Sequence, residues 1–247
     1  MRTIDLNADI GEGAGNDEQL LDIISSASIA CGGHAGDEKT IRNTLRLAHS
    51  KGVVCGAHPS FADKENFGRL LLDLPISELE EQISEQLKVI QKIANEENIP
   101  LLYVKLHGAL ANLASSDFEL AKAMFKIVKK HNDKMAILAL DNSAQVDAAK
   151  NIGLKIIKEA YADRRYENNG LLVSRKQKTA VITDKKQVVE QCLLLAQKGN
   201  IITIDGAVLK SEASSICLHG DNANAVELAK NIHKSLKIAG IEICSAL

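Results

Sequence analysis

Paired cysteines, an excess of charge of one sign, and long apolar runs are all missing from this 247-residue sequence. Its five cysteines show no Cys-x-x-Cys spacing, which predicts neither a disulfide framework nor a zinc knuckle and favours a reducing cytoplasm. A net charge of −2 gives no electrostatic reason to bind nucleic acid or a membrane surface. No apolar run approaches the roughly 18 residues of a spanning helix. We therefore expect a cytoplasmic protein whose partners are small molecules or other proteins.

Two familiar motifs for nucleotides and metals are also missing. The sequence has no Gly-x-x-x-x-Gly-Lys-Ser/Thr phosphate loop, and it contains neither His-x-His nor His-Glu-x-x-His. These absences count against a P-loop enzyme and against a metallopeptidase of the usual type. With 45% hydrophobic residues and no low-complexity linker, the chain is predicted to form a single domain over residues 1–247.

The rest of the sequence is organised around the stretch IACGGHAGD at 29–37. Its first three residues suit the end of a buried strand, its glycines permit a tight turn, and Asp37 can cap the following helix. This places His34 where a strand meets a helix. In parallel α/β folds, ligands and catalytic groups collect at this carboxyl end of the strand.

Short apolar runs alternate with helix-period stretches along the chain. The expected strands cover 3–9, 29–31, 53–58, 101–107, 135–140, 154–159, 201–205, 215–221 and 241–244. The first helix is expected at about 18–25, and two later ones at capping boxes formed by Ser77 with Glu80 and by Ser116 with Glu119. Repeated strand-then-helix units of this size predict parallel strands with crossover helices.

Polar groups close six of the predicted strands, and these are Asp9, His34, His58, His107, Glu159 and His219. In an open doubly wound sheet, a ligand binds at one switch point and draws on few strands. A closed barrel gathers every strand end around one mouth. We therefore predict a (β/α) barrel in which these six side chains converge on one pocket.

Each of these groups also has a purely structural interpretation. A single histidine at a strand end is more often a hydrogen-bonded turn residue than a catalytic one, but four of the seven histidines occupy such positions. Asp37 can be only a helix cap, and Asp9 can simply accept turn N–H groups. The cysteines on buried strands are interpreted as small apolar residues and not as nucleophiles.

Lys105 lies two residues before His107, so strand alternation places both side chains on one face. A buried lysine without an anion is costly. Its partner is therefore either a substrate carboxylate or phosphoryl oxygen, or a protein carboxylate such as Glu159 or Asp9. The sequence leaves both interpretations open.

Seven motifs, in this order, resemble the LamB/YcsF family. They are NADIGEG at 7–13, IACGGHAGD at 29–37, GAHPSFAD at 56–63, FGR at 67–69, VKLHGAL at 104–110, EAYADRRY at 159–166 and CLHGD at 217–221. The resemblance covers nearly the whole chain. It implies an α/β fold, an irregular (β/α) TIM-like barrel similar to the glycoside hydrolase/deacetylase superfamily. It also implies ATP-dependent opening of 5-oxo-L-proline to L-glutamate, with ADP and phosphate formed, in a complex with B and C subunits.

The chemistry of lactam opening assigns roles to the polar residues. Phosphorylation of the lactam oxygen by ATP would activate the ring, and the nucleotide would bind at the barrel mouth or through a partner chain. The residues expected to act in catalysis are Asp9, Glu12, His34, His58, Lys105, His107, Glu159, Asp163 and His219. Those expected to bind substrate or phosphate are Asn7, Asp37, Arg69, Arg164 and Asp221.

Two other functions stay open. Aspartate and histidine side chains at a barrel mouth also bind divalent ions such as Mg²⁺, so the chain could be a metal-dependent hydrolase or deacetylase of a small amide or carbohydrate. Asp9, His34 and His58 are the candidate ligands in that case. In the third interpretation the chain is a binding or regulatory subunit whose mouth only captures ligand.

Overall fold

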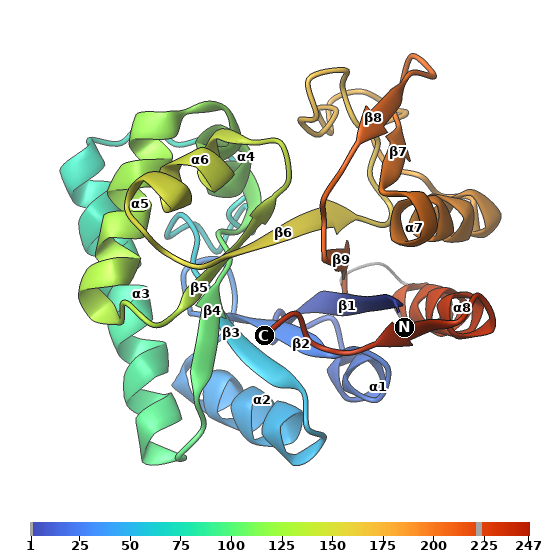
Figure 1. Cartoon of the computed structure of the whole chain (residues 1–247). Helices are drawn as coiled ribbons and strands as arrows, with labels where there is room; N and C mark the ends of the chain where they lie inside the picture. Colours follow the sequence, from blue (N-terminus) through green and yellow to red (C-terminus); the bar gives the residue numbers. More distant parts are fainter. Residues whose placement is uncertain (1, 221–223) are drawn as a thin grey trace.

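Seven parallel strands form a closed barrel in this protein, whose computed structural model describes residues 2–220 and 224–247. The strands follow one another as β1 (Arg2–Ile10), β2 (Ser26–Ala30), β3 (Val54–His58), β4 (Leu101–Val104), β5 (Ala136–Leu140), β6 (Ile156–Tyr161) and β9 (Ser215–Leu218). β9 pairs with β1 and closes the ring, while β10 (Ile241–Ile243) pairs with the start of β1 (Figure 1). The predicted irregular TIM-like barrel is confirmed.

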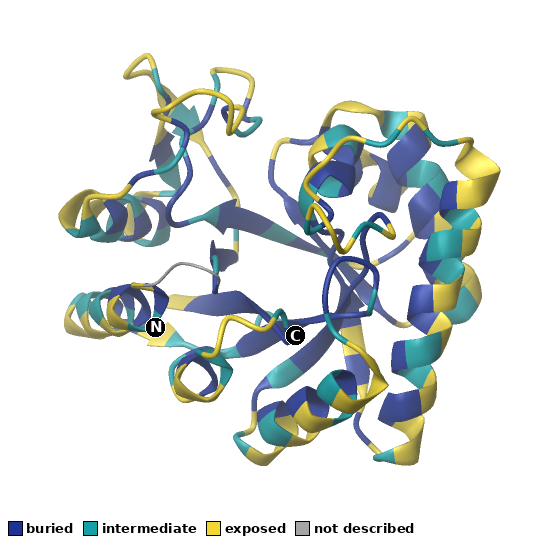
Figure 2. Cartoon of the chain, turned by 180° about the vertical axis from the view of Figure 1, so that it is seen from behind, coloured by how far each residue is buried: buried dark blue, intermediate teal, exposed yellow. Residues whose placement is uncertain are grey.

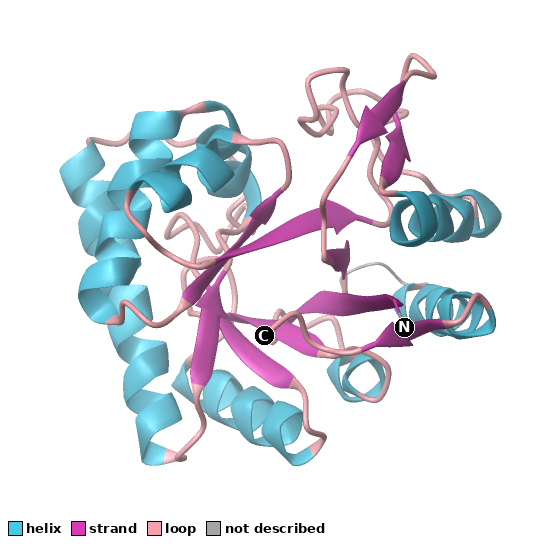
Figure 3. Cartoon of the chain, viewed as in Figure 1, coloured by secondary structure: helices cyan, strands magenta, loops and turns pink. Residues whose placement is uncertain are grey.

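Helices flank the barrel (Figure 3). They are α1 (Asp17–Leu21), α2 (Glu38–Ser50), α3 (Ile76–Glu96), α4 (Gly108–Ser116), α5 (Phe118–His131), α6 (Ala144–Asn151), α7 (Lys185–Lys198) and α8 (Ala225–Ile238). Their buried faces turn toward the strands and their exposed faces turn outward (Figure 2). Within residues 2–220 and 224–247, no helix combines the length and apolarity needed to cross a bilayer.

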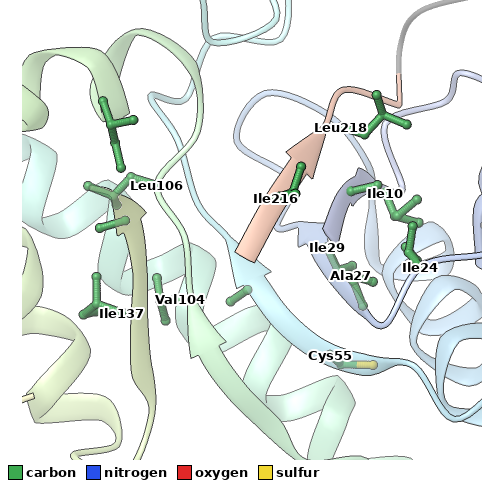
Figure 4. Packing of buried hydrophobic residues seen from close by; sticks show 14 of the residues in the cluster. Ile10, Ile24, Ala27, Ile29, Cys55, Val104, Leu106, Ile137, Ile216 and Leu218 are labelled. Carbon is green, nitrogen blue, oxygen red and sulfur yellow. The ribbon is translucent and has the colours of Figure 1, made fainter. Parts of the chain in front are cut away.

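Strand β1 shows how the sequence divides the barrel into an apolar outside and a polar inside. Its even-numbered residues from 4 to 10 are apolar and belong to the main core between strands and helices. Figure 4 shows side chains from this core, including Ile10, Ile29 and Ile216 on three adjacent strands. The alternate residues Asp5, Asn7 and Asp9 are also buried. Both faces of the strand are therefore packed, one by apolar and one by polar groups.

A small apolar cluster fills part of the barrel interior. Tyr103 packs there with three residues of β5 and β6, and Val54 and Ala246 lie against the group. Gly56 on β3 makes room for this ring, because a Cβ atom at position 56 would lie 2.3 Å from the Tyr103 ring. The Tyr103 hydroxyl reaches Ser28 at 3.1 Å, so its polar end is satisfied inside the barrel.

The structure corrects several local predictions. Residues 201–205 do not add a barrel strand, because β7 (Asn200–Ile202) pairs antiparallel with β8 (Val208–Lys210) in a separate hairpin beside α7 (Figure 1). The first helix ends at Leu21. Neither predicted capping box forms, because α3 already begins at Ile76 after Pro75, and α5 is capped by the Asp117 carboxylate. The segment between the predicted strand 101–107 and the second capping box is not a simple connection, because it forms α4.

Candidate active site at the barrel mouth

A cavity of about 320 Å³ opens where the barrel strands end. Its walls include six of the residues singled out in the sequence, namely Asp9, His58, Arg69, His107, Arg164 and His219. The other two strand-end groups, His34 and Glu159, do not line the cavity. His34 stacks on His107, which lines it, and Glu159 pairs with Lys105, which contacts the lining residue Asp9. The strand ends therefore bring the predicted groups to one region of the molecule.

Glu12 and three histidines form a compact cluster on one side of the cavity. The Nε2 atom of His34 lies 2.9 Å from Glu12 Oε1, and the His34 ring stacks on His107 with centroids 3.6 Å apart. His107 Nδ1 lies 3.0 Å from His58 Nε2. All three histidines are buried. His58 is the last residue of β3, whereas His34 and His107 lie after the ends of β2 and β4.

A close backbone approach holds His107 in this position. The 67–69 segment lies against the start of α4, where Ala109 N–H donates to Gly68 O at 2.9 Å. Gly108 has a φ of +59°, and a Cβ atom there would lie 2.4 Å from Gly68 O. His107 also approaches Phe67 O through its Nε2 atom at 3.0 Å. Glycine at position 108 is therefore required by both conformation and space.

Burial determines the protonation of two of these histidines. Desolvation, followed by the charge of His58, lowers the pKa of His34 to about 3. Desolvation and the two neighbouring histidines likewise hold the pKa of His107 well below its ordinary value. The shifts favour the neutral form of both rings.

Lys105 lies deeper in the barrel, among protein carboxylates. Its Nζ atom is 2.8 Å from Asp9 Oδ1 and 3.1 Å from Glu159 Oε1. Burial alone would lower the pKa of Lys105, but these carboxylates outweigh it and hold the pKa well above its ordinary value. Asn7 joins the same group by donating its Nδ2–H to Glu159 Oε1 at 2.9 Å. The observed partners of Lys105 therefore match the salt-bridge interpretation.

On the opposite wall, Asp163 orients His219. The His219 Nδ1 atom lies 2.8 Å from Asp163 Oδ1, and its Nε2 atom lies 3.1 Å from an Arg175 nitrogen. Because arginine only donates, His219 Nε2 accepts and its Nδ1–H donates to the carboxylate. Burial would raise the pKa of Asp163, but His219 lowers it below its ordinary value. The imidazole also stacks on Tyr161 with centroids 5.3 Å apart.

Besides Asn7, two predicted ligand-binding residues have structural partners. The Arg164 guanidinium donates to Val173 O at 2.7 Å and lies 3.4 Å from Ala180 O, so it ties together the segment that follows β6. Asp37 caps α2 by accepting from Thr40 N–H at 2.7 Å, and it lines a separate groove between α2 and α3. Asp221 falls outside the described residues.

Sequence reasoning missed two residues of the cavity wall. Arg175 ends the charge-dense stretch after β6 but was not assigned a role, and it lines the cavity beside His219. Tyr161 also lines it, two residues after Glu159. Strand alternation would have placed Tyr161 on the inner face with Glu159, so this signal was available.

The cluster of Glu12, His34, His58 and His107 is able to hold a metal ion. Each of the four offers one donor atom, and these atoms all lie within 4.8 Å of one another. The group differs from the predicted ligands, because it contains Glu12 and His107 in addition to His34 and His58. Asp9 is outside the group, with Oδ1 3.4 Å from His58 Nε2 and 2.8 Å from the Lys105 ammonium.

The fold and the mouth define a (β/α)-barrel protein with a histidine- and carboxylate-rich site at the carboxyl ends of its strands. The chain belongs to the LamB/YcsF family, whose model matches residues 4–247. It is 40% identical over 243 residues to a Neisseria meningitidis protein named as the A subunit of 5-oxoprolinase, covering 98% of this chain and 99% of the relative.

Solved structures agree with this assignment. The crystal structure of a lactam utilization protein from Thermus thermophilus superposes with a TM-score of 0.91 at 33% identity, covering 98% of this chain and 99% of that one. A family 4 carbohydrate esterase from Streptomyces lividans superposes with a TM-score of 0.55 at 11% identity, covering 100% of this chain and 92% of that one. The second likeness shows the fold alone.

Proposed function

We propose that this chain opens 5-oxo-L-proline to L-glutamate in an ATP-dependent reaction, as the A component of a complex with B and C subunits. The observation that carries the proposal is the 40% identity, over nearly the whole length of both chains, to a protein named as the A subunit of 5-oxoprolinase. The cavity supports it, because both cationic and titratable side chains line it. A lactam that carries a carboxylate needs cationic groups to bind the carboxylate and titratable groups to transfer protons during ring opening.

The cationic wall suits the anionic part of the substrate. Arg69 and Arg175 line the cavity and would neutralise the 5-oxoproline carboxylate or phosphoryl oxygens. ATP, when bound, supplies the phosphoryl group that activates the lactam oxygen. The cavity of about 320 Å³ is at the small end of ligand sites and suits a five-membered lactam acid better than a whole nucleotide.

Proton transfer is assigned to His219. Its Nδ1–H is held by Asp163, and its Nε2 lone pair accepts from Arg175, so this lone pair becomes free to take a proton when Arg175 turns to the substrate anion. In this tautomer the imidazole accepts a proton from an attacking water and returns it to the ring nitrogen as the C–N bond breaks. This cleavage leaves a mixed anhydride of the new carboxyl group and phosphate, and a second water hydrolyses it to glutamate and phosphate. The arrangement of carboxylate and imidazole is the one that orients a general base in other hydrolases.

The proposal is tested by reconstitution. The purified chain is assayed for glutamate and ADP alone, with purified B and C subunits, and with those subunits but no ATP. We expect glutamate only when the chain, both partners and ATP are present together. Steady turnover by the chain alone would contradict the need for partners, and glutamate formation without ATP would contradict the activation step.

The second candidate, a metal-dependent hydrolase or deacetylase of a small amide or carbohydrate, is favoured by the Glu12–His34–His58–His107 cluster. It predicts ATP-independent hydrolysis that stops after chelation and returns when metal is added. Acetylated sugars and small lactams, offered to the chain alone without nucleotide, separate the two candidates directly.

A further inference from the structure

Two histidines in the cluster have their outer nitrogens held by backbone carbonyls. His58 Nδ1 lies 2.8 Å from Lys105 O, and His107 Nε2 lies 3.0 Å from Phe67 O. A carbonyl oxygen only accepts, so each of these nitrogens carries its hydrogen. In the neutral rings, the remaining nitrogens, His58 Nε2 and His107 Nδ1, carry the lone pairs.

These two lone-pair nitrogens face each other at 3.0 Å, with the ring planes at 89°. Neither can donate to the other in the neutral form, so the contact is repulsive unless a positive charge lies between them. Glu12 Oε1 completes a triangle, at 3.5 Å from His107 Nδ1. Ligand bonds of about 2.1 Å put neighbouring donor atoms about 3.0 to 3.4 Å apart, depending on whether the geometry is octahedral or tetrahedral. The 3.0 Å spacing between the two nitrogens lies in this range, and the 3.5 Å spacing to Glu12 lies just above it.

We propose that Glu12, His58 and His107 bind one divalent transition-metal ion, of the class of Zn²⁺ or Fe²⁺, and that His34 positions Glu12. The ion would lie at the edge of the mouth cavity, because His58 and His107 both line it, and its remaining coordination positions would face the cavity. The inference concerns binding and does not depend on the reaction proposed above.

His34 is assigned the outer role because of its geometry. Its ring is parallel to that of His107, at 3° and 3.6 Å between centroids, so the in-plane lone pairs of the two rings do not converge on one ion. The Nε2–H of His34 donates instead to Glu12 Oε1 at 2.9 Å. Its Nδ1 lies 2.9 Å from the oxygen of the Ser60 hydroxyl, which donates to Phe61 O at 2.8 Å. Hydrogen-bonded partners of this kind orient metal ligands and strengthen binding.

The donor set also selects the type of ion. Two imidazoles and one carboxylate suit Zn²⁺, Fe²⁺ and related ions, whereas Mg²⁺ prefers oxygen ligands and retains water. The donor set therefore points away from Mg²⁺, which the sequence left as a possible ion. Asp9, one of the predicted ligands, is held by Lys105 instead.

The first test measures metal on the full-length chain, purified without chelator and without a histidine tag. Elemental analysis by mass spectrometry should find close to one transition-metal ion per chain. After chelation, titration with Zn²⁺ in competition with a chromophoric chelator should return one tight site, and Co²⁺ should give a visible d–d spectrum.

Variants assign the ligands. His58→Gln and His107→Gln should each weaken Zn²⁺ binding by at least about 100-fold, and His34→Gln and Ser60→Ala by roughly 10- to 100-fold. His219→Gln is the matched control, because this histidine lines the same cavity but is held by Asp163. It should keep the affinity and stoichiometry of the wild type.

The proposal is overturned if the wild-type chain neither contains nor binds a transition metal, since a shared proton would then occupy the position between the rings. Unchanged Zn²⁺ affinity in a folded His58→Gln or His107→Gln protein would also exclude the assigned ligands. If a variant does not fold, the wild-type stoichiometry and the Co²⁺ spectrum still decide the question. None of these results depends on glutamate formation, so the metal site and the lactam reaction can fail separately.

Discussion

The side chain of Lys105 shows how a charge is accommodated at the scale of a single residue. It is buried between Asp9 and Glu159, with Asn7 Oδ1 at 3.4 Å and the Cys217 sulfur at 3.0 Å. The sequence left open whether this lysine contacts substrate or a protein carboxylate. The contacts favour a role in neutralising the two acids.

We expect Lys105→Met to destabilise the protein by about 3 to 5 kcal/mol, because it leaves buried carboxylates without their cation. The free energy of unfolding in urea, followed by circular dichroism, measures this effect. The double variant Lys105→Met/Glu159→Gln should recover part of the loss, because it removes one of the two uncompensated charges. Wild-type stability in Lys105→Met, together with lost turnover, would instead support direct contact with substrate.

A second prediction at the residue scale concerns the Asp163–His219 pair. An asparagine side chain in place of the carboxylate can donate its amide N–H to His219 Nδ1 and so favour the tautomer whose Nε2 carries hydrogen. Asp163→Asn should therefore lower kcat of the reconstituted complex by roughly 10²- to 10⁴-fold with little change in KM. Glu167→Gln, a charge change in the same segment, is the control and should keep kcat.

If the role of Asp163 is purely structural, its substitution should change the stability of the protein and not kcat. Its pKa is lowered in the folded state, so its contribution to stability is present above the unfolded value of about 3.9 and is lost as the pH falls through the folded pKa. The stability difference between wild type and Asp163→Asn should stay constant from neutral pH to about pH 5 and shrink in stronger acid. A large stability loss with normal kcat would contradict the assignment to proton transfer.

At the scale of the element, Asp37 at the start of α2 has two candidate roles, as a helix cap and as a ligand-binding residue. Asp37 caps this helix through Thr40 N–H, and the helix packs Ile41, Leu45 and Ala48 into the core. The 29–37 turn thus connects a buried strand to an anchored helix, which positions the loop carrying His34.

Asp37→Ala should destabilise the protein by about 1 kcal/mol, whereas Asp37→Ser should stay close to wild type because serine also caps a helix. Thermal unfolding measures both. If the residue acts only as a cap, Asp37→Ser keeps the activity of the reconstituted complex. Lost activity in a fully stable Asp37→Ser protein would show that the carboxylate contacts ligand, as the family resemblance suggests.

At the scale of the whole molecule, the two ends of the chain pair with each other beside the closed ring. β10 pairs with the first residues of β1, and Cys244 N–H donates to Ile4 O at 3.1 Å. Ala246 then packs against the interior cluster around Tyr103. The last seven residues therefore extend the sheet and cover part of the interior.

Deletion of residues 241–247 should cost about 3 kcal/mol or more, because it exposes the surface buried by Ile241 and leaves the start of β1 without its partner. Urea unfolding of the truncated chain measures the loss. Deletion of Leu247 alone, which is 38% exposed, is the control and should change little. Equal stability of the longer deletion would mean that the seven-stranded ring is stable without β10.

The predicted architecture rested on strand alternation and on strand ends. In β1, the alternation of Ile4, Leu6 and Ala8 with polar residues is a local property, and the barrel contains it as predicted. Helix caps were less predictable, because Ser116 and Asp117 are adjacent candidates and only the backbone conformation selects Asp117. The β7–β8 hairpin could not be separated from a barrel strand, since a short apolar run does not indicate its partner.

By itself, the sequence determined the repeating strand–helix units, the buried faces and the concentration of polar groups at the strand ends, because these depend on periodicity and turn chemistry within a few residues. Only the tertiary structure decided which polar groups meet. Lys105 contacts Asp9 across 96 positions of sequence, and His107 contacts His58 across 49. Such pairings follow from the closure and register of the barrel, which no local pattern specifies.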